Sequence, residues 1–292
     1  MDNQKLISVA DFSPEELRKW QLKLLEILVY FRDFCQENNL RFFLAAGTSL
    51  GAVRHKGFIP WDDDVDVTMP REDYDKLIKI WNKKADTSRF VCEVTRKDYC
   101  AKFPMAVIRS VNTTCIYDHS VDDDICQGMK IDVEFLDGLP NSSFGQKINE
   151  NCAFVFALMR GQRVPARPAK KYKIIAKVLL TLFPTKSIRY AISNLCEKRL
   201  KKFKFSESEY VRYLFSSKKK REWYDDVKYL EFEGYQMPVP IGVEKVLTAG
   251  YKDYMQFPPE EKRKPATKNL FFYDLDHSYL DYKGKKYCVK QK

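Results

Sequence analysis

The sequence predicts an α+β fold in which helices flank a mixed sheet and a mainly helical, basic part follows toward the C-terminus. Three observations lead to this class: an apolar stripe at helical spacing opens the chain, short strand-like runs fill residues 41–135, and Lys and Arg concentrate beyond them. The chain has 292 residues, of which 45% are hydrophobic and 31% charged. This length and composition suit one large soluble domain or two modest ones.

The first expected element is a helix that begins at Pro14. Ser13 is a suitable N-cap, Pro14 fits the first helical position, and Glu16 completes a capping box. Apolar residues then recur at helical spacing: Leu17, Trp20, Leu24, Leu28, Phe31 and Cys35. This stripe predicts one buried face, and Asn38-Asn39 ends the helix.

Six short runs predict strands, because each is compactly apolar or alternates between polar and apolar residues. They are residues 41–46, 64–69, 90–95, 103–110, 113–117 and 129–135. We expect the third, fourth and fifth runs to form a meander. Residues 47–55 form a glycine-punctuated turn with room for a short helix, and a helix that opens at Pro70 runs to about Lys84.

The run Gly138-Leu139-Pro140-Asn141 breaks this pattern, so we place a domain boundary there. It divides the chain into residues 1–140 and residues 141–292. In the second part, residues 146–159 have helical character. Residues 170–183 and 186–203 predict two basic helices that Pro184 separates.

The positive charge is concentrated in one segment. The formal net charge is +11, yet residues 160–204 alone hold fourteen Lys and Arg against the single acid Glu197, so the rest of the chain sums to −2. Such a block fits docking on an anionic partner, which is a membrane surface, an anionic polymer or a nucleic acid.

The cysteine and apolar patterns indicate a cytoplasmic chain. None of the eight cysteines forms a C-x-x-C pair, and with three histidines no zinc spacing is present. Reduced thiols are therefore expected. The N-terminus lacks the apolar core of a signal peptide, and the most apolar run, Ile174–Phe183, carries Lys177 and is too short to span a bilayer.

The strongest chemical signal is Asp64-Val65-Asp66-Val67. Residues two apart on a strand point the same way, so Asp64 and Asp66 are expected on one face with the valines in the core. Two carboxylates this close raise a pKa unless a cation lies between them. Mg²⁺, with Mn²⁺ as the alternative, takes such oxygen ligands and also binds phosphates.

A third carboxylate completes sites of this kind, and Asp132 is the candidate. It lies in Lys130-Ile131-Asp132-Val133-Glu134-Phe135, which again alternates, so Glu134 on the same face is the reserve candidate. Asp132 is also the candidate general base for an acceptor hydroxyl.

Gly47, Thr48 and Ser49 follow the first apolar strand and predict an anion site, because backbone N–H groups at such a turn bind phosphate. Arg54 and Arg109 are candidate phosphate contacts. For Arg109 an ordinary ion pair is an equal alternative.

Three neighbouring features have more ordinary interpretations. We expect Asp62 and Asp63 to be solvated turn residues and His55 to be structural. The spacing of Asp62, Asp64 and Asp66 also matches a calcium loop, but Val67 stands where such a loop needs Gly and position twelve is Asp73, which excludes it.

Together these motifs resemble a known family. Gly47-Thr48-Ser49 followed by Asp64-Val65-Asp66 resembles the nucleotidyltransferase signature, and the fuller string over residues 51–66 is similar to the LicD family, which includes the fukutin-related protein. The likeness continues through Arg109 with Asn112-Thr113-Thr114, then residues 131–137, then residues 251–255 with Pro258-Pro259. The family pattern prefers Gly where Lys252 stands.

The resemblance implies a nucleotidyltransferase fold and a phosphotransferase. Such proteins move phosphocholine from CDP-choline to a sugar hydroxyl of a cell-surface glycan, such as a lipopolysaccharide or a teichoic-acid precursor, and relatives move ribitol phosphate. It implies that Asp64, Asp66 and Asp132 are catalytic residues that bind the metal, and that residues 1–140 form the catalytic domain. Gly47 and Ser49 would contact the donor phosphates, and CMP would leave.

For the basic segment the resemblance suggests a lipid-linked glycan acceptor at the inner face of the membrane. A basic amphipathic helix can lie on anionic lipid, and the alternative is that its apolar face packs on the catalytic part. Two rival functions remain. One is a nucleotidyltransferase acting on an antibiotic or an RNA end; the other is a nucleic-acid-binding module, which leaves the three aspartates unexplained and makes nucleic acid a disfavoured partner.

Overall fold

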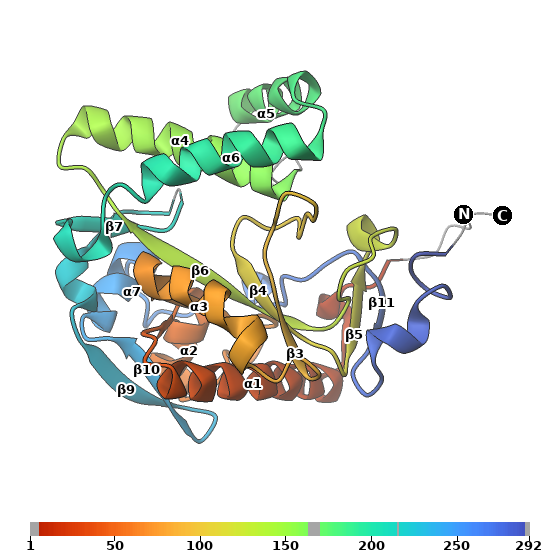
Figure 1. Cartoon of the computed structure of the whole chain (residues 1–292). Coiled ribbons are helices and arrows are strands. Elements are labelled where there is room, and N and C mark those ends of the chain that lie inside the picture. The colour runs from red at the N-terminus through yellow and green to blue at the C-terminus, as the bar shows by residue number, and fades with distance from the viewer. Residues whose placement is uncertain (1–5, 163–169, 215, 290–292) are drawn as a thin grey trace.

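The computed structural model describes residues 6–162, 170–214 and 216–289. Its largest sheet has seven strands. Five follow the order β1-β2-β6-β4-β3, while β7 pairs with the end of β6 and β8 pairs with β7. In Figure 1, α1 runs along the lower side of this sheet, whereas α4, α5 and α6 form a separate layer at the top. The predicted α+β class with a mixed sheet is confirmed.

The bounds of the elements follow the chain. The helices are α1 (Pro14–Glu37), α2 (Ala46–His55), α3 (Arg71–Lys84), α4 (Ser143–Gly161), α5 (Lys170–Leu182), α6 (Lys186–Leu200) and α7 (Val243–Tyr251). The strands are β1 (Phe43–Leu44), β2 (Asp66–Pro70), β3 (Phe90–Glu93), β4 (Ala106–Ser110), β5 (Thr114–Tyr117), β6 (Lys130–Gly138), β7 (Tyr210–Arg212), β8 (Lys219–Lys220), β9 (Val227–Phe232), β10 (Tyr235–Pro240) and β11 (Leu270–Asp274).

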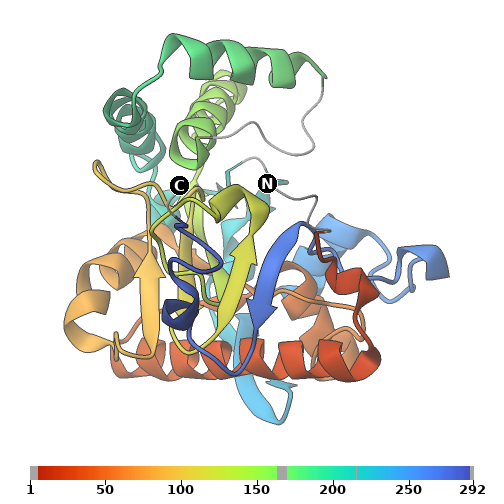
Figure 2. The same ribbon diagram turned by 90° about the vertical axis from the view of Figure 1, so that its right-hand side faces the viewer.

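The predicted meander is wrong. Strand β4 pairs antiparallel with β3 on one side and with β6 on the other, so it has no free edge for β5. Strand β5 pairs instead with β11, near the end of the chain. Figure 2 shows β5 and β11 side by side, and the two form a two-stranded sheet of their own. Strand pairing across such a sequence distance is not encoded in the local pattern.

Segments on both sides of residue 140 share the main sheet. The end of β6 pairs with β7, so Asp137 lies opposite Arg212 and Gly138 opposite Val211. The hairpin of β9 and β10 packs beside β1 and α2. The division into residues 1–140 and 141–292 therefore stays a prediction. The two parts are connected by hydrogen bonds between β6 and β7.

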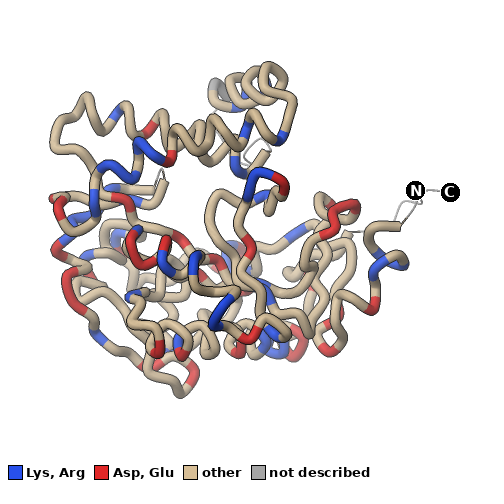
Figure 3. The backbone as a smooth tube through the Cα atoms, viewed as in Figure 1, with Lys and Arg blue, Asp and Glu red and all other residues tan. Residues whose placement is uncertain are grey.

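The two basic helices are confirmed as α5 and α6, and Lys and Arg recur along the tube in this part of Figure 3. Residues 163–169 of the basic segment lie outside the described residues. After α6 the chain is no longer mainly helical, because strands β7 to β11 and the short α7 follow. No helix in the described ranges combines the length and the apolar character that crossing a bilayer requires.

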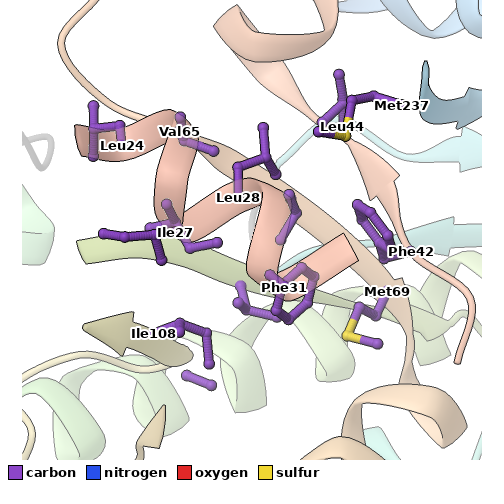
Figure 4. Close-up of a cluster of buried hydrophobic side chains, with 14 of the residues drawn as sticks. Leu24, Ile27, Leu28, Phe31, Phe42, Leu44, Val65, Met69, Ile108 and Met237 are labelled. Atoms are coloured by element: carbon purple, nitrogen blue, oxygen red, sulfur yellow. The ribbon is translucent and has the colours of Figure 1, made fainter. Parts of the chain in front are cut away.

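Helix α1 begins as predicted. The Ser13 hydroxyl accepts from the Glu16 N–H at 3.2 Å and the Glu16 carboxylate accepts from the Ser13 N–H at 2.8 Å. Its apolar stripe packs on the sheet: Figure 4 shows Phe31 of α1 near Met69 of β2, and Leu28 belongs to the same buried cluster. Each such fully buried side chain contributes about 1.5–3 kcal/mol. This core fixes the apolar face of the sheet and leaves the acidic face free.

Candidate active site

The central feature of the acidic face is the pairing of β2 with β6. The two strands are parallel, and their register sets Asp66 beside Asp132 and Thr68 beside Glu134. The intervening Val65 and Val67 are buried in the core. Paired residues of neighbouring strands share a face, so Asp66, Asp132 and Glu134 face the same side.

Asp64 precedes β2 by two residues and belongs to the same charge cluster. Burial raises its pKa, and the charges of Asp63 and Asp132 raise it further. For Asp66, burial holds the pKa well above its usual range, with Asp64 and Asp132 adding to the effect. Carboxylates that raise one another's pKa in this way are deficient in positive charge. The arrangement is therefore suited to bind a cation.

Lys130 also belongs to this site, although the sequence analysis did not predict it. Its ammonium forms an ion pair with the Asp132 carboxylate, and both side chains are largely buried. Its charge also lowers the pKa of both Asp64 and Asp66, against the effect of burial. The signal was present, because Lys130 stands two residues before Asp132 and so shares its strand face. One lysine does not balance the acids around it.

The donor set fits a hard divalent cation such as Mg²⁺ or Mn²⁺. All the candidate ligands are carboxylate oxygens, and one oxygen of Asp62, Oδ2, is buried without a hydrogen-bond partner among the described residues. Burial, then Asp64 and Asp63, raises the pKa of Asp62 to about 8. Over the described ranges no three His, Cys, Asp or Glu side chains already converge as a complete metal site. Cation binding would therefore require these carboxylates to move closer together.

The expectation that Asp62 and Asp63 are solvated turn residues is wrong. Asp63 is 3% exposed, and its carboxylate accepts from the backbone N–H groups of Ala266 at 2.9 Å and Thr267 at 2.8 Å. It thereby fastens the acidic loop to a segment two hundred residues further along. Such a partner was invisible in the local sequence.

The turn at residues 47–49 lies inside helix α2, which begins at Ala46. The Thr48 hydroxyl accepts from the backbone N–H of Asp66 at 3.0 Å, so it positions one of the acids. Gly47 has the Asp62 carboxylate beside it: a Cβ here would lie 2.7 Å from Oδ2. Ser49 is 1% exposed and its hydroxyl has no partner among the described residues. The phosphate role of these three residues stays a prediction.

Arg109 requires a correction. It lies on β4 and is 2% exposed. Its guanidinium donates to the Glu93 carboxylate at 2.6 Å and to the Gly128 carbonyl at 2.8 Å. A phosphate contact would break this buried pair, which is costly. The ion-pair alternative is the better one, and Arg109 is a structural residue that joins β4 to β3.

Arg54 faces a pocket beside the acids. The pocket has a volume of about 780 Å³, and Gly47 and Asp62 are among its lining residues. Arg54 Nη1 donates to the Tyr254 carbonyl at 3.0 Å, and His55 packs edge-on to Phe257 with the ring centroids 5.7 Å apart. His55 thus has the structural role expected of it.

Residues from the second half of the chain complete the surroundings. Burial and then the charges of Asp62 and Asp66 raise the pKa of Tyr251, at the end of α7, to about 12. Burial lowers the pKa of Lys219 on β8, and the charge of Glu134 opposes that shift. Tyr251 belongs to the stretch 251–255 that resembles the family, whereas no local pattern marks Lys219, and the fold brings both residues to the site.

Comparison with known proteins agrees with the nucleotidyltransferase-like fold. Residues 39–120 match the family described as LicD/FKTN/FKRP, nucleotidyltransferase domain. The chain is 30% identical over 269 residues to the lipopolysaccharide cholinephosphotransferase LicD of Haemophilus influenzae, which covers 85% of this chain and 95% of that protein. The chain belongs to the LicD family.

Shorter matches include uncharacterized proteins of two Rickettsia species. The protein from Rickettsia prowazekii is 36% identical over 67 residues, 21% of this chain and 25% of that protein. The one from Rickettsia typhi is 40% identical over 72 residues, 24% of this chain and 23% of that protein.

Proposed function

We propose that this chain is a metal-dependent phosphotransferase that moves phosphocholine from CDP-choline to a sugar hydroxyl of a cell-surface glycan and releases CMP. One observation carries the chemistry: the register of β2 and β6 sets Asp66 beside Asp132 on one sheet face. The choice of phosphocholine follows the Haemophilus influenzae relative, whose similarity extends over nearly its whole length.

In this mechanism Asp64, Asp66 and Asp132 would hold the cation. A bound Mg²⁺, with Mn²⁺ as the alternative, supplies the positive charge that neutralises the donor diphosphate as it breaks. Thr48 keeps Asp66 in place through its hydrogen bond to the Asp66 N–H. The first turn of α2, at Gly47, directs backbone N–H groups to the donor phosphates.

The reaction is an in-line displacement. The acceptor hydroxyl oxygen forms a bond to the distal phosphorus of the donor, while the bond from that phosphorus to the bridging oxygen breaks and CMP leaves. Asp132 takes the proton of the attacking hydroxyl. Lys130, paired with Asp132, keeps the surrounding acids from repelling the donor.

The test is a panel of donors given to the wild-type protein. CDP-choline, CDP-ribitol, CDP-glycerol, CTP and ATP are each incubated with the protein and Mg²⁺, with and without lipopolysaccharide or a teichoic-acid precursor. We expect acceptor-dependent CMP release from CDP-choline. Turnover of CTP or ATP alone would support the rival nucleotidyltransferase on an antibiotic or RNA end and would overturn the proposal.

We also propose that α5 rests on an anionic membrane, where a lipid-linked acceptor lies. One face of α5 packs inward through Ala176, which is fully buried against residues of α4. The opposite face exposes an apolar stripe at helical spacing: Ile174, Ile175, Val178 and Leu182 are 44–64% exposed. Lys173 and Lys177 are exposed beside it. An apolar stripe flanked by lysines suits the interface of an anionic bilayer.

Cosedimentation with vesicles tests this surface. We expect binding to vesicles rich in anionic lipid at low salt, weakening as salt rises, and a large loss in the Val178→Glu variant. Leu195→Glu, also on an exposed apolar position but on α6, is the matched control. Equal binding to neutral vesicles, or none to anionic ones, would remove the proposal and leave the phosphotransferase assignment untouched.

A further inference from the structure

The pocket beside Asp62 is built from distant parts of the chain. Helix α2 and the loop before the acids form one wall, and residues 251–263, from the end of α7 onward, form the other. The lining residues are Gly47, Leu50, Arg54, Ile59, Trp61, Asp62, Tyr251, Asp253, Tyr254, Gln256, Phe257, Pro258, Pro259 and Arg263. Its volume of about 780 Å³ lies in the range of small-molecule sites.

Two arginines line this pocket without a carboxylate partner among the residues that the structure describes. Within the described part of the chain, Arg54 donates only to the Tyr254 carbonyl and to His55, and Arg263 donates to the Pro258 carbonyl at 2.8 Å. Over the described ranges neither one forms an ion pair, although Arg71 and Arg109 each bind a carboxylate at 2.6 Å. The two free cationic groups therefore remain available for an anionic ligand.

An aromatic platform holds both guanidinium groups. The Arg54 guanidinium carbon lies 4.4 Å from the centroid of Phe257, and that of Arg263 lies 5.4 Å from the same ring. Trp61 supports the platform, with its ring centroid 6.3 Å from that of Phe257. Stacking of this kind restricts the arginines, so less freedom is lost when a ligand binds.

The two cations also interact with one another. Burial lowers the pKa of Arg54, and the charge of Arg263 lowers it further. Two like charges held this close repel in the empty pocket, and a ligand with more than one negative charge relieves the repulsion. A diphosphate is such a ligand, and guanidinium groups bind phosphate oxygens two at a time.

A trimethylammonium group is the contrasting candidate for an aromatic pocket. Such a group needs aromatic faces without competing cations. Here Arg54 and Arg263 already lie over Phe257, so a choline head group would meet like charge. The pocket thus selects for phosphate over choline.

We infer that Arg54 and Arg263, on the Trp61–Phe257 platform, bind the phosphates of a nucleoside diphosphate donor, and that the choline head group lies outside this pocket. The inference rests on the proposed function and deepens it. It makes the loop of residues 252–263 part of the donor site, with Arg263 as a residue that determines donor affinity.

Direct binding tests the inference without turnover. CMP, CDP-choline, inorganic pyrophosphate and choline chloride are titrated by calorimetry into wild type, Arg263→Gln, Arg263→Lys and the control Lys262→Gln, whose exposed side chain neighbours Arg263. We expect Arg263→Gln to weaken CDP-choline and pyrophosphate about tenfold or more, since it removes charge-assisted bonds. Arg263→Lys should keep only part of the wild-type affinity for these two ligands, and the control Lys262→Gln should bind them like wild type.

In kinetics, Arg263→Gln raises KM for the donor and leaves KM for the acceptor unchanged. Wild-type affinity for CDP-choline and pyrophosphate in Arg263→Gln would overturn the inference, as would binding of choline chloride to the wild-type protein that pyrophosphate displaces. The outcome also separates the two proposals. If pyrophosphate and CMP bind in an Arg263-dependent way but CDP-choline is not turned over, the pocket assignment stands and the donor assignment fails.

Discussion

The hydrogen bond between Thr48 and Asp66 provides a quantitative test of how the fold positions an acid. Thr48 is 2% exposed and its hydroxyl accepts from the Asp66 N–H at 3.0 Å. Replacing it with Val keeps the shape and the β-branching, so no cavity forms, but the part-buried N–H of Asp66 loses its partner. Such an orphaned donor costs about 1–3 kcal/mol. We expect that loss in the free energy of unfolding of Thr48→Val.

Thr48→Ser is the matched control. It keeps the hydroxyl and removes one methyl group, which costs about 0.8 kcal/mol. Both variants are therefore destabilised, but only Thr48→Val releases the backbone at Asp66. We expect kcat to fall about tenfold or more in Thr48→Val and to stay near wild type in Thr48→Ser, a tenfold change being about 1.4 kcal/mol.

Urea unfolding and CMP release measure the two quantities on the same preparations. Equal kcat in the Val and Ser variants would refute the positioning role, whatever their stabilities. An unfolding free energy unchanged in Thr48→Val would refute the hydrogen-bond argument itself.

Three further outcomes are expected. The Asp137 carboxylate holds Arg71 at 2.6 and 2.7 Å with both side chains buried, so Asp137→Asn should lower the unfolding free energy by about 3 kcal/mol in urea titrations; a loss below about 1 kcal/mol would contradict the pairing. Lys252 has a φ of 61°, where Gly is unstrained, so Lys252→Gly should raise the unfolding free energy by about 1 kcal/mol, and destabilisation would count against that strain. Burial raises the pKa of both Cys115 and Cys126 to about 11, so at pH 8 they remain neutral thiols, and a thiol reagent followed by peptide mass mapping should leave them unmodified until the protein unfolds; rapid native labelling of either would contradict this.

Local signals predicted the elements well. The capping box at Ser13 and the stripe after it identified α1, because all the information lies within one helix. Alternation likewise identified the acidic strands, and the register then set Asp132 beside Asp66. A period of two fixes which face a side chain occupies, and a short strand has few other choices.

Longer-range features could not be predicted. Strand β5 pairs with β11 because both edges of β4 are already paired, one of them with β6. No local sequence pattern indicates this. Asp63 looked solvated because its partners, Ala266 and Thr267, are two hundred residues away. The place of Arg263 in the pocket could not be predicted for the same reason, because the opposite wall is formed by residues far earlier in the chain. Lys130 differs from these features, because the alternation of β6 alone indicates that it shares a strand face with Asp132.

The most direct test of the account is CMP release from CDP-choline after the protein has been treated with a chelator and then titrated with Mg²⁺. We predict that wild type recovers activity with Mg²⁺, whereas Asp66→Asn stays inactive at every concentration. That variant should remain folded, because it removes a charge that its neighbours repel, and Asp281→Asn, at an exposed site, should behave like wild type. Full activity in the chelated wild-type protein, or Mg²⁺-dependent turnover by Asp66→Asn, would contradict the central claim that these paired strands hold the reacting phosphates through a shared cation.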